Sequence, residues 1–115
     1  MANVKRGDVL VVRRRLGFDV GHRREHFVVL QSDMLSKDLD TVLVAPLDED
    51  LALYRADPLV VHVTKREAGT PSPQVVLIAH MTSVLRERFD VGRVGRLRAG
   101  SMRDIEKLLI ILLEL

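Results

Sequence analysis

Five short runs of Val, Leu and Ile, each bordered on at least one side within a few positions by charged residues, Pro or Gly, constrain most strongly how this chain folds. The runs are residues 8–12, 27–30, 41–45, 59–64 and 75–79. None is long enough for a helix, and β-branched residues favour strands. The connections hold at most one or two helical turns, expected around residues 48–55, so the strands are predicted to pair antiparallel and to curl into a small barrel. Pro46 is expected to end the third strand.

The C-terminal part of the chain changes from strand to helix periodicity. Residues 91–97 predict one more short strand, with glycines where a bulge or a sharp bend fits. A helix is then expected from Ser101, which is followed three residues later by Asp104 in a capping arrangement. Apolar residues cover most of this helix: Ile105, Leu108, Leu109, Ile110, Ile111, Leu112 and Leu113. So broad an apolar face predicts packing against the barrel and against a second subunit.

Composition indicates the class of protein. The 115 residues fit one domain, 1–115, of the α+β class with mainly β structure. With three Phe, one Tyr and no Trp, the core must be aliphatic, and the absence of Cys excludes disulfides and thiolate metal sites. The N-terminus shows no signal peptide, and the longest aliphatic stretch, residues 108–113, is too short to cross a membrane. A cytoplasmic protein is therefore expected.

The net charge of +2 hides a strong asymmetry along the chain. Residues 1–24 carry seven Lys or Arg against two Asp, whereas residues 32–58 carry seven Asp or Glu against one Lys and one Arg. A basic N-terminal loop on a nearly neutral protein can bind phosphate or an acidic protein segment. On charge alone, a solvated loop without a ligand is an equally good interpretation.

The sequence motifs of most enzyme classes are missing. There is no glycine-rich phosphate loop, no Gly-x-Ser-x-Gly elbow and no His pair at the spacing of a helical zinc site. His22 and His26 are four residues apart, but in a loop that enters a strand, where this spacing does not bring them to one face. His62 and His80 are interpreted as structural. Neither a metal nor a cofactor is therefore expected.

The order of several segments matches a known family. They are residues 5–8 (Lys-Arg-Gly-Asp) with the strand and the basic loop after them, 27–33, 41–47, 76–83, 92–97 and the terminal helix with Met102. In this order the chain resembles the MazF/PemK toxins over essentially its whole length. The resemblance implies a small antiparallel SH3-like β-barrel of the CcdB/MazF/PemK kind with a C-terminal α-helix, and a symmetric homodimer.

The middle of the chain carries a second resemblance. Residues 27–33, 46–47, 58–63 and 81–83 are similar to CcdB, a toxin that poisons DNA gyrase and shares the MazF fold. Both resemblances imply the same fold but different functions. MazF-like proteins cleave single-stranded RNA, whereas CcdB-like proteins trap a topoisomerase on DNA. The long basic loop favours the MazF-like function, since CcdB-like chains have a shorter connection there.

The catalytic positions of the MazF family carry other residues in this chain. In that family an Arg-Pro pair begins the second strand, and a Thr or Ser ends the third. Here the matching residues are Glu25 and His26 in the first case and Asp48 in the second. Both expected catalytic side chains are thus replaced, so an inactive relative that only binds remains an alternative.

Neighbouring residues offer a substitute set of catalytic groups. Cleavage of RNA without a metal needs a base for the 2′-OH, an acid for the leaving 5′ oxygen and a cation near the phosphorane. Arg24, with Arg23 beside it, is the candidate cation, and Glu25 with His26 or His22 is the candidate acid and base pair. The alternative is that Glu25 and His26 merely begin a strand.

The resemblance therefore implies the toxin of a type II toxin-antitoxin system, acting as a metal-independent endoribonuclease or mRNA interferase. The candidate catalytic residues are Arg24, Glu25, His26 and Asp48. The candidate RNA-binding residues are Arg13, Arg14, Arg15, His22, Arg23, Gln31, Ser83 and Arg86. The alternative function is a CcdB-like, non-enzymatic poison of DNA gyrase that binds its target through the C-terminal helix. In either case an acidic, partly disordered antitoxin is the expected partner.

Overall fold

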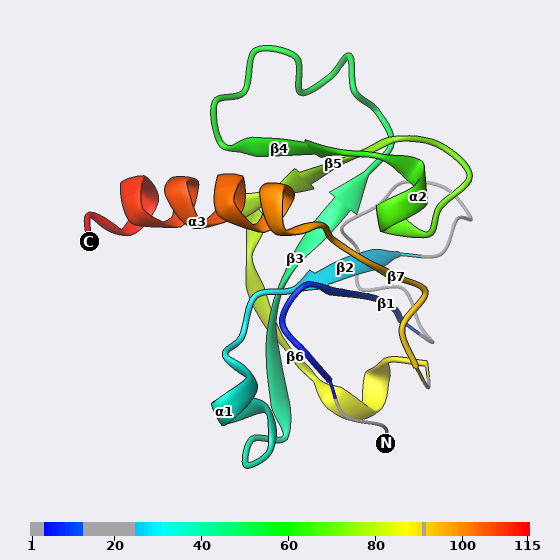
Figure 1. The fold of residues 1–115 in the computed structure, drawn as a ribbon, viewed down its shortest axis with the longest axis vertical. Coiled ribbons are helices and arrows are strands. Elements are labelled where there is room, and N and C mark those ends of the chain that lie inside the picture. Colours follow the sequence, from blue (N-terminus) through cyan, green and yellow to red (C-terminus); the bar gives the residue numbers. More distant parts are fainter. Residues whose placement is uncertain (1–3, 13–24, 91) are drawn as a thin grey trace.

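The structure, a computed structural model, describes residues 4–12, 25–90 and 92–115 of the chain. Within these residues, short strands form one curled sheet, and a long helix lies at the C-terminal end (Figure 1). The strands are β1 (Asp8–Val11), β2 (His26–Val29), β3 (Thr41–Asp48), β4 (Val60–Val63), β5 (Gln74–Leu77), β6 (Thr82–Leu85) and β7 (Gly95–Arg96). The helices are α1 (Asp33–Ser36), α2 (Lys65–Ala68) and α3 (Ala99–Leu113), and two 3-10 turns cover Ile78–His80 and Arg86–Arg88.

All the strand pairs in the described sheet are antiparallel. The strands lie side by side in the order β4-β5-β3-β2-β1-β7, and β6 pairs with the first half of β3. A bridge between Val12 and Phe89 joins the end of β1 to the turn after β6, so the sheet curls back on itself. The predicted fold class, mainly β with a small antiparallel barrel and a C-terminal helix, is confirmed in the form of a half-barrel.

Strand β3 holds the sheet together, because it pairs with three other strands. Its first half pairs with β6 and its last two residues with β5, while β2 lies along its other edge. The prediction that Pro46 ends this strand is wrong, because Pro46 lies opposite Phe27 inside it. The backbone N–H of Leu30 donates to the carbonyl of Leu43, so the backbone groups of Leu43 face β2. Because the backbone groups of successive residues in an antiparallel strand point to alternate sides, the nitrogen of Pro46 faces away from β2. The missing N–H therefore costs no bond to β2.

Both faces of the sheet are buried. Val9 and Val28 belong to the apolar cluster beneath α3, whereas the adjacent residues Leu10 and Phe27 belong to a second cluster on the opposite face. Phe27 meets Phe89 edge to face, with the ring centroids 6.0 Å apart. Apart from this pair, the described core is built from aliphatic side chains, as the composition predicts.

The connections contain elements that the sequence analysis did not predict. Helix α1 follows β2, and α2 follows β4. Strand β6 lies between the predicted strands 75–79 and 91–97, where the sequence analysis predicted no strand. Residues 49–55 follow β3 as bends and turns and form no helix: the side chain of Asp48 accepts a bond from the N–H of Asp50, and that of Asp50 accepts one from the N–H of Leu53.

The start of α3 also differs from the prediction. The helix begins at Ala99, and Arg98 occupies the N-cap position. Ser101 does not cap the helix; its hydroxyl donates to the carboxylate of Glu67 at 2.7 Å. Strand β7 covers only two residues of the predicted strand 91–97.

Two glycines let the backbones of α2 and the β7 segment touch. Gly69 ends α2 with a φ of +71°, and a Cβ at this position would lie 2.0 Å from the carbonyl oxygen of Val94. A Cβ at Gly95 would lie 2.4 Å from the carbonyl oxygen of Glu67. Gly95 therefore serves a close backbone approach rather than the bulge expected for residues 91–97. This contact places Glu67 next to the start of α3.

The second half of α3 extends beyond the sheet (Figure 1). Ile105 in the first half is fully buried, whereas Ile110, Ile111 and Leu113 are 50%, 66% and 50% exposed. Only part of the predicted apolar face thus packs against the barrel. No helix in the described part of the chain is long and apolar enough to cross a membrane.

Candidate functional site

Two of the predicted catalytic residues lie at the same end of the paired strands β2 and β3. The register pairs Phe27 with Pro46, and continued by two residues it places Glu25 opposite Asp48. Glu25 is buried, with 3% of its surface exposed, and Asp48 is half-buried. His26, the half-buried first residue of β2, follows Glu25 directly. This end of the sheet therefore carries two carboxylates and an imidazole, the residue types that general acid and base catalysis uses.

Backbone bonds fix this end of the sheet. The N–H of Val12 donates to the carbonyl of Glu25 at 3.2 Å, so β1 and β2 stay paired up to this residue. Oδ1 of Asp48 accepts a bond of 2.8 Å from the N–H of Asp50, which begins the turn after β3. The predicted basic residues Arg13, Arg14, Arg15, His22, Arg23 and Arg24 lie outside the described residues. Glu25, His26 and Asp48 are thus the part of the predicted catalytic set that the structure places.

Three other predicted RNA-binding residues lie at the opposite end of β3. Gln31 follows β2, and Ser83 and Arg86 lie on β6 and just after it, where β6 pairs with the start of β3. Strand β3 is eight residues long, so roughly 20 Å separates these residues from Asp48. The structure therefore does not bring the two predicted groups together within one chain.

Backbone carbonyls hold Gln31 and Arg86 in place. The amide nitrogen of Gln31 donates to the carbonyl of Thr41 at 3.3 Å. Nη2 of Arg86 donates to the carbonyl of Leu39 at 2.9 Å and to that of Ser36. These bonds fasten the connection around α1. Contact of either side chain, or of the exposed Ser83, with RNA stays a prediction.

The histidines do not form a metal centre in the part of the chain that is described. His22 lies outside it, and His26 begins β2. His62 on β4 and His80 in the turn after β5 are both exposed, although the sequence analysis interpreted them as structural. Among the described residues, no group of three or more His, Cys, Asp and Glu side chains could hold a metal ion.

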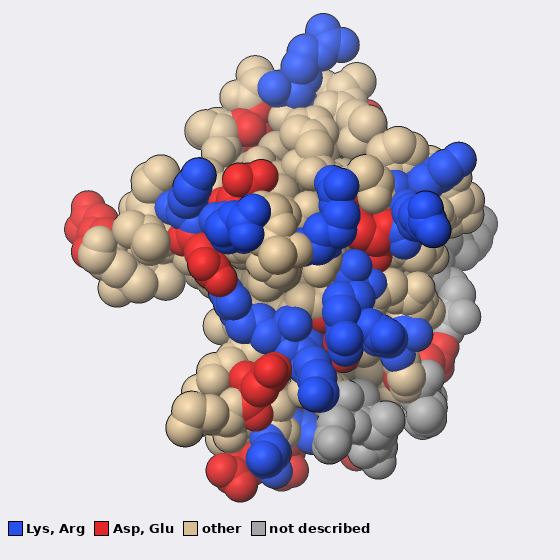
Figure 2. Space-filling model, viewed as in Figure 1, with Lys and Arg blue, Asp and Glu red and all other residues tan. Residues whose placement is uncertain are grey.

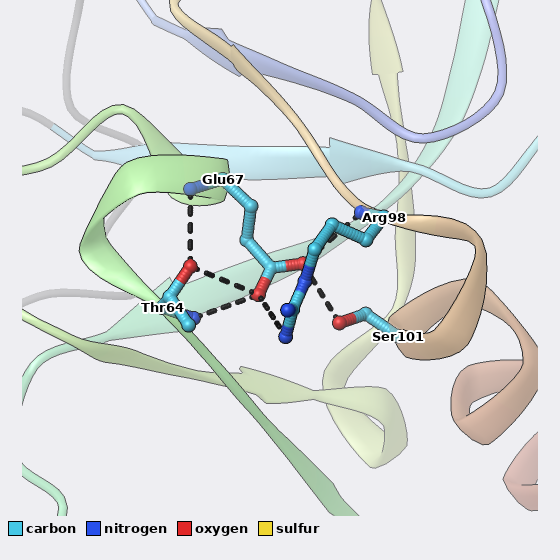
Figure 3. A network of polar contacts seen from close by, with 4 residues as sticks. All are labelled: Thr64, Glu67, Arg98 and Ser101. Carbon is cyan, nitrogen blue, oxygen red and sulfur yellow. Dashed lines mark hydrogen bonds and ion pairs between the residues drawn. The ribbon is translucent and has the colours of Figure 1, made fainter.

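Glu67 is a buried carboxylate that the sequence analysis missed. The N–H and hydroxyl of Thr64 donate to its Oε2 at 2.8 and 3.1 Å, and the N–H of Arg98 and the hydroxyl of Ser101 donate to its Oε1 at 3.1 and 2.7 Å (Figure 3). The guanidinium of Arg98 lies 3.4 Å from Oε2. Burial raises the pKa of Glu67, but these hydrogen bonds, led by the one from the backbone of Thr64, keep the pKa below its usual value. The Thr-x-x-Glu spacing is the sequence signal that would have revealed this capping box.

Asp8, in the opening Lys-Arg-Gly-Asp segment, has a structural role too. It is 3% exposed, and its Oδ1 accepts a bond of 3.0 Å from Nε of Arg96 and lies 2.9 Å from Nη2 of the same residue. The pair connects the start of β1 to β7. The neighbouring Arg6 places Nη1 2.8 Å from Oε1 of Glu106 on α3. The opening segment thus joins β1, β7 and α3.

Comparison with known sequences identifies a family. A family model described as "PemK-like, MazF-like toxin of type II toxin-antitoxin system" matches residues 5–113. No curated protein sequence matches the chain. The family match covers every described helix and strand, from the start of β1 to the end of α3.

Several solved structures have the same fold. A chain of the MazE-MazF structure from Deinococcus radiodurans has 18% identity and a TM-score of 0.77, with 99% of both chains covered. An endoribonuclease from Mycobacterial species, solved in complex with its cognate antitoxin, has 16% identity and a TM-score of 0.76 over 100% of this chain and 97% of that one. The Mycobacterium tuberculosis toxin MazF-mt6 has 16% identity and a TM-score of 0.75 over 94% and 97%. These structures establish the fold, and the family match establishes that the chain belongs to the PemK-like, MazF-like toxins of type II toxin-antitoxin systems.

Proposed function

We propose that this toxin is an endoribonuclease that cleaves single-stranded RNA without a metal ion. The observation that supports the proposal is the pairing of Phe27 with Pro46, because the same register continued by two residues would bring Glu25 opposite Asp48. Val12 and Glu25, the described residues on either side of the basic segment 13–24, are joined by a backbone hydrogen bond at this end of the sheet. The similarity to the mycobacterial endoribonuclease supports the proposal.

In the proposed reaction the 2′ oxygen of a ribose attacks the adjacent phosphorus, and the bond from phosphorus to the 5′ oxygen breaks. Glu25 or Asp48 accepts the proton of the 2′-OH, and protonated His26 donates a proton to the leaving 5′ oxygen. Arg24 stabilises the charge that develops on the phosphorane. The products are a 2′,3′-cyclic phosphate and a 5′-OH end.

Incubation with a long single-stranded RNA in excess EDTA tests this function. We expect discrete cuts that leave 5′-OH ends, because the proposed groups act without a metal. The cleavage activity should elute together with the protein in a final size-exclusion step, which separates the protein from a contaminating nuclease of different size. RNA that stays intact at high protein concentration contradicts the proposal.

A second function, poisoning of DNA gyrase without catalysis, is favoured by one observation. If a second copy of the chain does not cover it, the protruding end of α3 presents Ile110, Ile111 and Leu113, all at least half-exposed, as a surface on which a partner enzyme can pack. This function agrees with the replacement of both family catalytic residues. It is the conclusion if RNA stays intact and the protein inhibits supercoiling by gyrase in a parallel assay.

We propose an acidic antitoxin as the partner of this protein in the cytoplasm. The mycobacterial relative was solved in complex with its cognate antitoxin, and the relative from Deinococcus radiodurans in a MazE-MazF structure. The basic segment 13–24 attracts an acidic chain, and a partly disordered one gains order as it binds.

We also propose that α3 forms a symmetric homodimer. A groove of about 510 Å³ lies between β4 and α3, and its apolar lining includes Val60, Leu108 and Ile111. A second copy of the same face would bury this groove and the protruding half of α3.

The dimer proposal predicts a particle of twice the 13.0 kDa chain mass in sedimentation equilibrium. Ile111→Glu should raise the dissociation constant by roughly thirtyfold or more, because a charge would enter an apolar contact. Leu53→Glu is the matched control, since Leu53 is 68% exposed on the connection between β3 and β4. A monomeric parent chain, or equal effects of both variants, contradicts the proposal.

A further inference from the structure

Five arginines form a band across the face of the molecule formed by α2, β7 and the first half of α3. They are Arg66, Arg93, Arg96, Arg98 and Arg103, and we call them the arginine band. Figure 2 shows Lys and Arg side chains gathered across the middle of this face. None of these residues belongs to the predicted site at Glu25 and Asp48.

Buried carboxylates hold part of the band in place. Asp8 binds Arg96 at 2.9 Å and lies 4.0 Å from Arg93, and Glu67 lies 3.4 Å from Arg98. The side chains of the two acids are 5% and 2% exposed, whereas those of Arg96 and Arg98 are 47% and 70% exposed. These guanidinium groups are therefore fixed at their inner side and open to solvent at their outer side, which lowers the entropy lost when they bind a ligand.

The remaining arginines carry unneutralised charge. Arg66 and Arg103 are exposed, and within the described residues neither forms an ion pair. Against Asp8 and Glu67, the arginine band keeps a surplus of three positive charges. Lys65, next to Arg66, is exposed as well and adds to this surplus.

The spacing of the band suits a repeated anion. Arg96 and Arg98 flank the buried Leu97 on an extended stretch, so their side chains leave the same face roughly 7 Å apart. Strand β1 connects the band to the predicted site. Asp8, which holds Arg96, is four residues from Val12, which bonds to Glu25, a distance of roughly 13 Å along β1.

We propose that the arginine band binds the phosphodiester backbone of single-stranded RNA and holds the strand that flanks the cleaved bond. The choice of RNA as ligand rests on the proposed ribonuclease function. One guanidinium group can bind two oxygens of a phosphate at once. Four of the five arginines lie in the short segment 93–103.

An acidic polypeptide is the weaker candidate for this surface. A segment that folds as it binds needs apolar pockets to hold its side chains. In residues 92–98, Val94 is the exposed large apolar residue, at 45%, and Leu97 is buried. The apolar groove among the described residues lies elsewhere, between β4 and α3. The arginine band thus offers charge without apolar anchors, which suits a phosphate backbone.

Binding of a fluorescent, fully 2′-O-methylated single-stranded RNA tests the band, because this probe lacks the 2′-OH and cannot be cleaved by the proposed reaction. The test variant is R66Q/R103Q, and the matched control is K37Q/R55Q, which removes the same charge at exposed residues on α1's C-cap and on the connection between β3 and β4. We expect R66Q/R103Q to weaken binding roughly tenfold at moderate salt, and to lower the slope of log K against log salt by about 1.4. The control should change binding less than about twofold.

The outcomes separate this inference from the ribonuclease proposal. If the parent chain cuts natural RNA but R66Q/R103Q binds the probe with an unchanged slope, the band inference fails and the ribonuclease proposal stands. If the parent chain binds the probe through the band but cuts no RNA, the band inference stands and the ribonuclease proposal fails. Three results would overturn the inference. In the first, K37Q/R55Q weakens binding as much as R66Q/R103Q does, and in the second the parent chain does not bind the probe. In the third, R66Q/R103Q loses binding to poly-glutamate but keeps its binding to RNA.

Discussion

Replacing Glu67 by glutamine is expected to lower the free energy of unfolding by about 3 kcal/mol. The carboxylate accepts bonds from Thr64, Arg98 and Ser101 and is almost fully buried (Figure 3). Glutamine keeps the shape but turns an NH₂ group towards groups that are themselves donors, and it leaves Arg98 without its partner. Chemical denaturation measures the loss, and Glu106→Gln is the control. Glu106 pairs with Arg6 at half-exposed positions, so that change should cost no more than about 0.5 kcal/mol.

The effect of Glu67→Gln should also depend on pH in a defined direction. The pKa of Glu67 is lowered in the folded protein from an ordinary value of 4.5, so the folded state favours the ionised form. Its contribution to stability is therefore complete above about pH 4.5 and is lost as the pH falls through the lowered folded-state pKa. The stability difference between the parent chain and Glu67→Gln should narrow in acid. A difference that stays constant from about pH 7 to about pH 3 would show that charge has no part in the effect.

Of the variants Asp48→Asn and Glu25→Gln, the one that removes the acceptor of the 2′-OH proton is expected to slow RNA cleavage by about a hundredfold or more. Both changes remove a carboxylate that can accept the 2′-OH proton and keep the size of the side chain. The asparagine side chain would retain an oxygen for the bond from the N–H of Asp50, so the turn after β3 should persist. The rate of cutting of a short labelled RNA under single-turnover conditions is the appropriate measurement.

Asp50→Asn is the matched control for these variants. Asp50 is exposed, lies two residues beyond Asp48 and accepts a bond from Leu53. This variant should cut RNA at the parent rate. The double variant of Glu25 and Asp48 should lose little more than the worse single variant if the two residues act in one step. Cleavage at the parent rate by both single variants would remove these carboxylates from the mechanism.

The sequence predicts the β-rich part of this fold well because buried strands consist of continuous Val, Leu and Ile runs. It misplaces elements whose limits depend on contacts between distant segments. Pro46 stays inside β3 because its nitrogen faces away from β2, a fact that depends on strand register. Ser101 has the appearance of a helix cap, but the nearby carboxylate of Glu67 takes its hydroxyl, and Arg98 becomes the N-cap. Strand β6 has too short an apolar run to stand apart from β5.

The candidate site, too, can be predicted only in part from the sequence. The residue types at Glu25, His26 and Asp48 are visible in the sequence, and antiparallel pairing of β2 and β3 places Glu25 and Asp48 at one end of the sheet. The separation of Gln31, Ser83 and Arg86 from them follows from the length of β3 and is not visible from residue types. The arginine band escapes notice for a further reason. The buried acids that position Arg96 and Arg98 are 88 and 31 residues away along the chain.

The shared position of β3 has a consequence for the lifetime of the protein. Because β2, β5 and β6 all bond to β3, none of these strands can detach without breaking its hydrogen bonds to β3 and exposing the core. Partly open forms, the usual substrates of cellular proteases, are therefore expected to be scarce. Degradation would then have to wait for complete unfolding, so the toxin should outlast a partner that is disordered when free.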